Sequence, residues 1–100
     1  MNLHELASNV NSKETFLEFV SALRDDWYAS REEERAQPSS PYGRDARGWE
    51  NPDLGGFLDA LGSWLEVADR YYHNIDHPLD TSQPSWRLFA DTLLSAKIYE

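Results

Sequence analysis

The side chains best suited to chemistry are an aspartate and two histidines in the second half of the chain. Asp69, His73 and His77 are spaced four residues apart, and Asp76 lies beside the last of them. On a helix, a carboxylate and an imidazole four residues apart share one face and can bind Zn²⁺ together. Pro78 is expected to end the helix before His77 comes into line, and no second cluster supplies a fourth ligand. The other interpretation is a solvated helix end at which the helix dipole stabilises His73.

Other catalytic patterns are missing from the sequence. The chain has no cysteine, which excludes a cysteine nucleophile and thiolate metal ligands. It has no Gly-x-Ser-x-Gly motif, and the glycine pair at 55–56 lacks the lysine and the preceding strand of a phosphate-binding loop. Acidic runs occur at 25–26 and 32–34, but catalytic carboxylates need a desolvated cleft that a polar helix face does not provide. We therefore predict that the protein is not an enzyme and binds no metal or cofactor.

The composition is that of one folded domain spanning residues 1–100. Aromatic side chains make up 13% of the chain, which argues against a disordered protein. No apolar run approaches the roughly 20 residues that a membrane span needs, and the N-terminus lacks the pattern of a signal peptide. The sequence therefore predicts a globular protein of the cytoplasm that does not contact membranes.

The charge is strongly negative and unevenly distributed. The formal net charge is −9, and residues 1–37 and 53–81 carry the excess of acids, whereas the other segments are balanced. Nucleic acids and anionic lipids repel such a chain, because contacts to phosphates need clustered lysine and arginine. The same charge attracts basic proteins. We therefore predict a basic protein partner and no direct contact with nucleic acid, the alternative being that the acidity only keeps the protein in solution.

Two helices are predicted before residue 38. The first is short and places Leu3, Leu6, Ala7 and Val10 on one face, with Asn2 as its N-cap. The second begins after an Asn11 or Ser12 cap, with Glu14 as the capping-box acid, and runs to about Gln37 before Pro38. Its apolar face is formed by Phe16, Phe19, Val20, Leu23 and Trp27.

A loop rich in Pro, Gly and Ser is predicted at about 37–52. Trp49 is too large and apolar to remain in water and is expected to anchor this loop to the core. A third helix should start with Asn51 as its cap and Pro52 in its first position, and continue to about Tyr72. Its apolar arc is wide enough for the central helix of the fold.

The last helix is predicted from about Ser85 to Tyr99. Because no segment shows the alternation of a strand, the fold class is all-α: a compact four-helix domain in which a short N-terminal helix precedes three longer ones. The aromatic residues expected in the core are Phe16, Phe19, Phe57, Trp64, Trp86 and Phe89.

Acidic residues line up on the second and third predicted helices. On the second helix they fall within an arc of roughly 40°, opposite the apolar face. Tyrosines at the edges of the apolar faces should be exposed and could contribute contact area. For Asp69 the alternative role is a structural hydrogen bond or an ion pair with an arginine. The predicted partner-binding residues are Glu14, Glu18, Asp25 and Glu32, then Asp59, Glu66 and Asp69, together with Tyr28 and Tyr71.

From Trp49 to the C-terminus the chain resembles a family of small acidic bacterial proteins of unknown function. The similar segments are Trp49-Glu-Asn51, Leu54, Phe57-Leu58, Trp64, Asp69, Tyr71-Tyr72-His-Asn74, Pro84-Ser-Trp86, Ala90-Asp-Thr-Leu-Leu94 and Ala96-Lys-Ile-Tyr99-Glu100, and Phe16-Leu17-Glu-Phe19 is similar too. The loop at 37–48 and the N-terminal helix lie outside the resemblance. It implies a compact helical module with no assigned reaction, similar in size and acidity to immunity proteins and antitoxins.

The sequence therefore leads to one functional hypothesis and two alternatives. The hypothesis is a non-enzymatic binding protein, such as an immunity protein or inhibitor, that masks a basic partner such as a nuclease toxin. The first alternative is a small metal-dependent enzyme around Asp69, His73 and His77. The second is a structural module that buries its aromatic residues in a homodimer, so that the chain is expected as a monomer or a homodimer.

Overall fold

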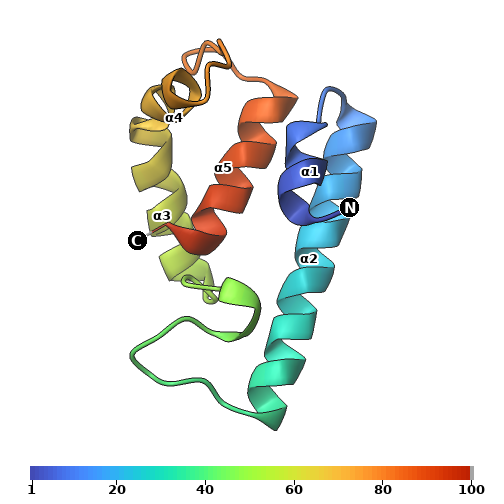
Figure 1. Ribbon diagram of the computed structural model, residues 1–100, viewed down its shortest axis with the longest axis vertical. Coiled ribbons are helices and arrows are strands. Elements are labelled where there is room, and N and C mark those ends of the chain that lie inside the picture. The colour runs from blue at the N-terminus through green and yellow to red at the C-terminus, as the bar shows by residue number, and fades with distance from the viewer. Residues whose placement is uncertain (100) are drawn as a thin grey trace.

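The computed structural model describes residues 1–99, and this part of the chain contains helices and no β-strand (Figure 1). The predicted all-α fold is confirmed. The helices are α1 (Leu3–Ser8), α2 (Lys13–Ala36), the short 3-10 helix η1 (Ala46–Gly48), α3 (Leu54–Glu66), α4 (Ala68–Asn74) and α5 (Trp86–Ile98). In the described residues, no helix has both the length and the apolar character that crossing a bilayer requires.

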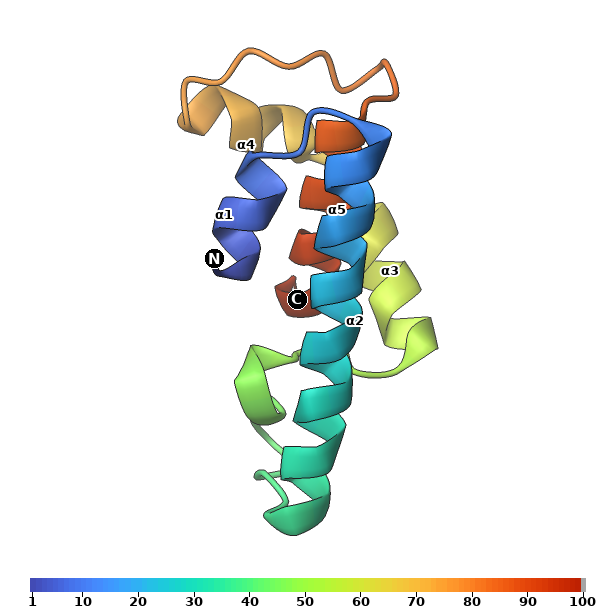
Figure 2. The same ribbon diagram turned by 90° about the vertical axis from the view of Figure 1, so that its right-hand side faces the viewer.

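Helix α5 lies at the centre of the fold. It packs against α1, α2 and α3, and α1 and α3 lie on opposite sides of it (Figure 2). The prediction that the third helix is central was wrong. The prediction failed because three polar residues of α5 are also buried and extend its buried surface beyond the apolar stripe. They are Asp91, Thr92 and Lys97. A pattern of hydrophobic residues cannot detect such positions.

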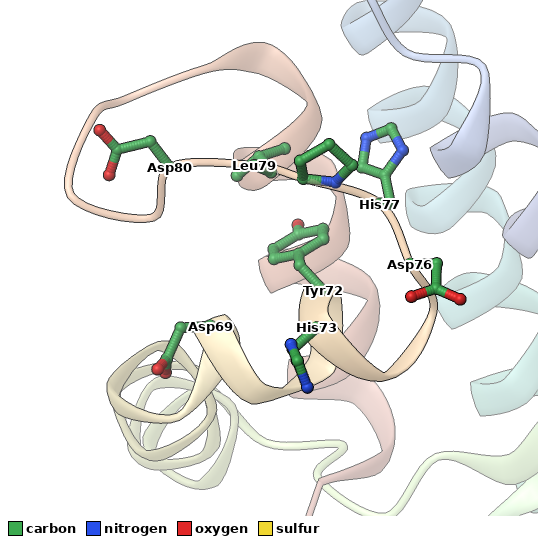
Figure 3. A pocket seen from close by; sticks show the side chains of 8 residues that line it. Asp69, Tyr72, His73, Asp76, His77, Leu79 and Asp80 are labelled. Carbon is green, nitrogen blue, oxygen red and sulfur yellow. The ribbon is translucent and has the colours of Figure 1, made fainter.

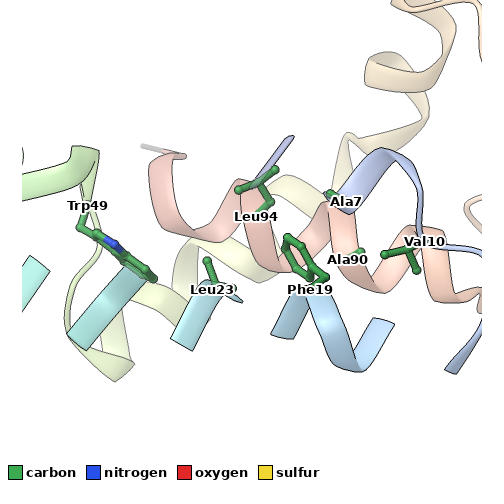
Figure 4. Close-up of a cluster of buried hydrophobic side chains, with 7 residues drawn as sticks. All are labelled: Ala7, Val10, Phe19, Leu23, Trp49, Ala90 and Leu94. Atoms are coloured by element: carbon green, nitrogen blue, oxygen red, sulfur yellow. The ribbon is translucent and has the colours of Figure 1, made fainter. Parts of the chain in front are cut away.

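The main core cluster joins α1, α2 and α5 to Trp49 (Figure 4). Its buried members are Ala7, Val10, Phe19, Leu23, Trp49, Ala90 and Leu94. A second cluster of Trp64, Ala68, Tyr72 and Leu88 connects α3 and α4 to α5. The expected core positions of Phe19 and Trp64 are confirmed, and Phe16 and Phe57 are partly buried against the main cluster.

Two aromatic residues expected in the core are substantially exposed. Trp86 is 40% exposed and Phe89 is 43% exposed, so they border the core without filling it. The Phe16 ring of α2 lies 5.4 Å from the Trp86 ring and 6.3 Å from the Phe89 ring. The prediction that Trp86 and Phe89 lie in the core was therefore wrong, because Phe16 covers each of them only in part.

Side chains cap the first two helices. Asn2 Oδ1 accepts a hydrogen bond from the Glu5 amide at 2.8 Å, as predicted for α1. On α2 the cap is Ser12, and its reciprocal partner is Thr15, whose hydroxyl accepts from the Ser12 amide. The predicted capping-box role of Glu14 was wrong, because Thr15 occupies the required third position. The predicted end of α2 near Gln37 is confirmed.

The predicted third helix is two helices with a different start. Asp53, not Asn51, caps α3 by accepting from the Gly56 amide at 2.7 Å. Asn51 instead donates to the carbonyls of Ala96 and Tyr99, which ties the chain to the end of α5. The helix is interrupted at Val67, whose φ of −115° and ψ of 13° depart from helical values. Val67 is β-branched, which disfavours a helix slightly. The spacing of the apolar residues on either side of it continues without change and gives no sign of the break.

The loop at 37–52 is held against the second half of α2. The 24-residue α2 is about 36 Å long, and its C-terminal part extends beyond the other helices (Figure 1). Glu34 accepts hydrogen bonds from the amides of Ser39 and Ala46, and Ser30 donates to the Ala46 carbonyl. Trp49 is only 4% exposed, which confirms its predicted role as the anchor.

Candidate functional site

The acidic line predicted on α2 is present at the surface. Glu14, Glu18, Asp25 and Glu32 are all exposed, and they follow one face of the helix for roughly 27 Å. Two of them are paired with bases on the same helix: Asp25 with Arg24 at 3.0 Å and Glu32 with Arg35 at 2.6 Å. Within residues 1–99, Glu14 and Glu18 have no ion pair. Of these four acids, the two without ion pairs therefore lie near the N-terminal end of α2.

The acids predicted on the third helix are also exposed, but they are divided between two helices. Asp59 and Glu66 are seven residues apart on one face of α3, and Asp69 follows the break on α4. None of the three forms an ion pair within residues 1–99. The role considered for Asp69, an ion pair with an arginine, belongs instead to Asp91, which pairs with Arg87 at 2.7 Å.

The two tyrosines proposed as contacts are exposed, as predicted, but they line different cavities. Tyr28 packs edge-on against Trp27, with ring centres 5.2 Å apart, and borders a cavity between α2 and α3. Tyr71 packs against Trp64 and borders a cavity near His4. The fold therefore does not bring the two tyrosines together in one cavity.

The aspartate and histidines considered for a metal site line a pocket of about 610 Å³ around α4 (Figure 3). Helix α4 ends at Asn74, before Pro78, as predicted. The backbone amide of His77 donates to the Tyr72 carbonyl, and the side chains of Asp69, His73 and His77 point in different directions. Among residues 1–99, no group of three or more His, Asp or Glu side chains is placed to hold a metal ion.

A buried ionic cluster around Asp26 was missed by the sequence analysis. Its carboxylate accepts hydrogen bonds from Arg47 Nε at 2.8 Å, from Trp49 Nε1 at 2.9 Å and from Lys97 Nζ at 2.9 Å. Burial alone would raise the pKa of Asp26, but the bonds from Lys97, Arg47 and Trp49 outweigh it and lower the pKa. The available signal was spacing: Asp26 follows Phe19 by seven residues and therefore lies on the core side of α2.

A second polar cluster connects three helices. Tyr72 on α4 donates its hydroxyl to Asp91 Oδ2 at 2.7 Å, and Arg87 Nε donates to the same oxygen at 2.7 Å. Arg87 also donates to the Ser8 carbonyl at the end of α1, at 3.3 Å. Burial, followed by the bond to Asp91, raises the pKa of Tyr72. These contacts satisfy buried groups within the fold, so their role is structural.

Replacing Tyr72 with phenylalanine is expected to lower the free energy of unfolding by about 2 kcal/mol. The charged carboxylate of Asp91 then loses the hydrogen bond that the tyrosine hydroxyl donates to it. The raised pKa also sets a pH dependence. The stabilisation by Tyr72 is complete below about pH 10 and decreases above it, because the tyrosine then ionises in the unfolded chain first. Urea denaturation of both proteins between pH 7 and 11 measures this. A difference that grows with pH would contradict the assignment.

The comparisons with known proteins place the chain in a family. A family model matches residues 12–100. The resemblance predicted from Trp49 onward and at Phe16–Phe19 is confirmed, and the match also includes the loop at 37–48, which the resemblance had left out. Neither the curated proteins nor the solved structures gave a match. Over residues 12–100, the chain belongs to DUF7660, a family of unknown function.

Proposed function

We propose that this protein is a non-enzymatic acidic binding protein that covers a basic surface of another protein, as an immunity protein or inhibitor does with a nuclease toxin. The observation that carries the proposal is the imbalance in its ion pairs. Seven of the nine basic side chains form ion pairs within residues 1–99. They are Arg24, Arg31, Arg35, Arg44, Arg47, Arg87 and Lys97.

The acids without ion pairs are available to a partner. Those predicted to bind are Glu14 and Glu18 on α2, Asp59 and Glu66 on α3, and Asp69 on α4, and all five are exposed. An uncompensated surface charge accelerates association with an oppositely charged protein and disfavours other partners. A nuclease presents such a basic surface because it binds phosphates. We place this activity in the bacterial cytoplasm, where an inhibitor would protect the cell's own nucleic acid.

The proposal predicts that two unpaired acids matter more than two paired ones. The double variant Glu14→Gln/Glu18→Gln is expected to weaken partner binding about tenfold, or about 1.4 kcal/mol. The matched control is Asp25→Asn/Glu32→Gln on the same helix, which changes the net charge equally but removes acids that Arg24 and Arg35 already neutralise. The control should weaken binding less than threefold, about 0.7 kcal/mol.

The partner for this measurement is captured from a lysate of the source organism at low salt, eluted by raising the salt and identified by mass spectrometry. Calorimetry with the purified partner then gives the affinities of the wild type and both variants. Because all four acids are exposed, the melting temperatures should not change. Equal affinities for all three proteins, or a partner without a basic surface, would overturn the proposal.

A further inference from the structure

One side of α5 has no helix packed across it. Helix α5 packs against α1, α2 and α3, whereas α2 and α3 make no comparable contact with each other in the described part of the chain. Figure 2 shows α1 and α3 on opposite sides of α5. Residues of α2 and α3 line one cavity together with Leu93 of α5, so these two helices border the uncovered side. The residues of α5 on this side are Trp86, Phe89 and Leu93, spaced three and four residues apart. Leu93 lines the cavity that α2 and α3 border, and Phe89 and Trp86, one and two turns earlier, lie on the same face of α5. We call this strip the α2–α3 groove.

Contacts show that apolar residues of α2, α3 and α5 meet in this groove. A cavity of about 390 Å³ lies between the two outer helices, lined by Trp27 and Tyr28 of α2, Leu54 and Phe57 of α3 and Leu93 of α5. Further along the groove, the Phe16 ring lies 5.4 Å from the Trp86 ring and 6.3 Å from the Phe89 ring. Apolar residues of α2 and α5 therefore meet at two places along the groove, at this cavity and at Phe16, and α3 joins them at the cavity.

Of the exposed large hydrophobic side chains, Tyr28 and Leu54 line the cavity, and helix spacing assigns others to the walls of the groove. On α3, Leu54 lines the cavity. Leu58 and Leu65 follow it by four and eleven residues, so they lie on the same face of the helix. On α2, Leu17 lies eleven residues before Tyr28, on the same helix face. Exposed apolar surface that is contiguous is rare in monomers and marks an interaction site. The members are Leu17, Tyr28, Leu54, Leu58, Leu65, Trp86 and Phe89.

Acidic residues lie just outside the groove on both of its walls. On α2, Glu18 and Asp25 are about 80° further around the helix than Leu17 and Tyr28, away from the core. Asp25 is paired with Arg24, which also lines the cavity, so within residues 1–99 Glu18 is the acid without an ion pair on this wall. On α3, Asp59 and Glu66 are about 110° beyond the leucines, again away from the core. Two copies joined through this groove would bring their acidic rims together, and each copy carries a net charge of −9. A basic occupant fits the groove, and a second copy does not.

We propose that the α2–α3 groove binds an amphipathic helix of a basic partner protein, an inference that rests on the function proposed above. The apolar face of this helix would lie on Trp86, Phe89 and Leu93, and lysine or arginine side chains on its flanks would reach the acidic rims. Leu54 and Leu65 are separated by about 17 Å along α3, so about three turns of helix fill the groove. This is helix-in-groove recognition, in which apolar residues supply the affinity and the charges at the edges select the partner.

The test uses a designed peptide as the probe. The peptide is a helix of about 15 leucine and lysine residues with the leucines on one face, and a peptide with glutamate in place of each lysine is its control. Leu58→Ser removes an apolar contact from the groove. The matched control Ile75→Ser removes another exposed apolar residue that lies outside the groove; Leu58 is 54% exposed and Ile75 is 44% exposed. Calorimetry gives the affinities, and backbone NMR shifts locate the bound peptide.

The Leu/Lys peptide is expected to bind, and Leu58→Ser should weaken it about tenfold while Ile75→Ser changes it less than twofold. The Leu/Glu peptide should not bind, and the largest NMR shifts should fall on Tyr28, Leu58 and Phe89. Absent binding, equal effects of the two variants, or shifts centred outside the groove would overturn the inference. A homodimer in light scattering that Leu58→Ser dissociates would also overturn it, because a second copy would then occupy the groove.

The inference and the proposed function can fail separately. If Glu14→Gln/Glu18→Gln weakens binding of the captured partner but Leu58→Ser does not, the acidic binding function stands and the groove is not its docking site. If neither variant has an effect on that partner, the proposed function itself fails. Because Leu58 is exposed in the free protein, unchanged melting of Leu58→Ser shows that any effect is on binding and not on folding.

Discussion

Replacing Trp49 with alanine is expected to destabilise the protein by about 4 kcal/mol and to free the loop at 37–52 from α2. The indole is buried in the main core cluster, its ring lies 6.2 Å from that of Phe57, and its Nε1 donates to Asp26. Alanine would leave a cavity and remove the hydrogen bond. The midpoint of urea unfolding measures the loss, and faster hydrogen exchange at the amides of Asp45, Ala46 and Gly48 would show that the loop is released.

Two further variants test whether the loss of stability comes from the packing of Trp49 or would follow from any substitution of an aromatic residue in this loop. Trp49→Phe keeps much of the apolar contact but loses the bond to Asp26, so it should cost about 1–2 kcal/mol. Tyr42→Ala alters an aromatic residue of the same loop that is almost fully exposed, and it should leave the unfolding midpoint unchanged. If Trp49→Ala unfolded at the wild-type midpoint, the loop would not be anchored through its indole.

Replacing Asp26 with asparagine is expected to destabilise the protein by about 3 kcal/mol. The Asp26 side chain is 12% exposed and that of Lys97 is 11% exposed, so the substitution leaves a lysine ammonium with little access to water and no carboxylate. Breaking one partner of a buried pair costs about 3–5 kcal/mol, and the residual exposure favours the lower value. The melting temperature should fall by more than about 10 °C. Asp25→Asn, one residue earlier and exposed, should have almost no effect.

The contribution of Asp26 also depends on pH. Its pKa is lower in the folded protein than in the unfolded chain, so the stabilisation is complete above about pH 4 and is lost as the pH falls below that value. The difference in unfolding free energy between wild type and Asp26→Asn should therefore shrink between pH 5 and pH 2. A constant difference over this range would mean that the carboxylate charge is not what stabilises the fold.

The effects of Trp49 and Asp26 should not be additive. Both residues take part in one hydrogen bond, and Lys97 lies 5.4 Å from the Trp49 ring as well as 2.9 Å from Asp26. The double variant Trp49→Ala/Asp26→Asn should therefore cost less than the sum of its parts, because the second change removes contacts already lost. These residues hold the loop and the end of α5 to α2, so the charges that stabilise the fold are separate from the exposed acids of the proposed binding surface.

The acidic surface itself could be predicted well from the sequence. Each of the seven acids named as a contact is exposed, because an unpaired carboxylate opposite an apolar face has no stable place except in water. The spacing of residues along α2 could not predict that Asp25 and Glu32 form ion pairs. The side chains of their partners, Arg24 and Arg35, could equally have pointed elsewhere. Asp26 was also expected among the acids on the polar face of the helix. It follows Phe19 by seven residues, however, and this spacing places it on the core side of α2.

By itself, the sequence determined the helical class, most helix ends and the anchoring tryptophan, because caps, prolines and apolar spacing act within a few residues. The tertiary structure alone decided which helix is central, which charges are buried and which aromatic residues stay exposed. Asp91 and Lys97 are buried because Arg87, Tyr72 and Asp26 arrive from elsewhere in the chain to satisfy them. Trp86 and Phe89 remain exposed because Phe16 of α2 covers them only in part. Burial depends on neighbours in space, and spacing along the chain does not identify those neighbours.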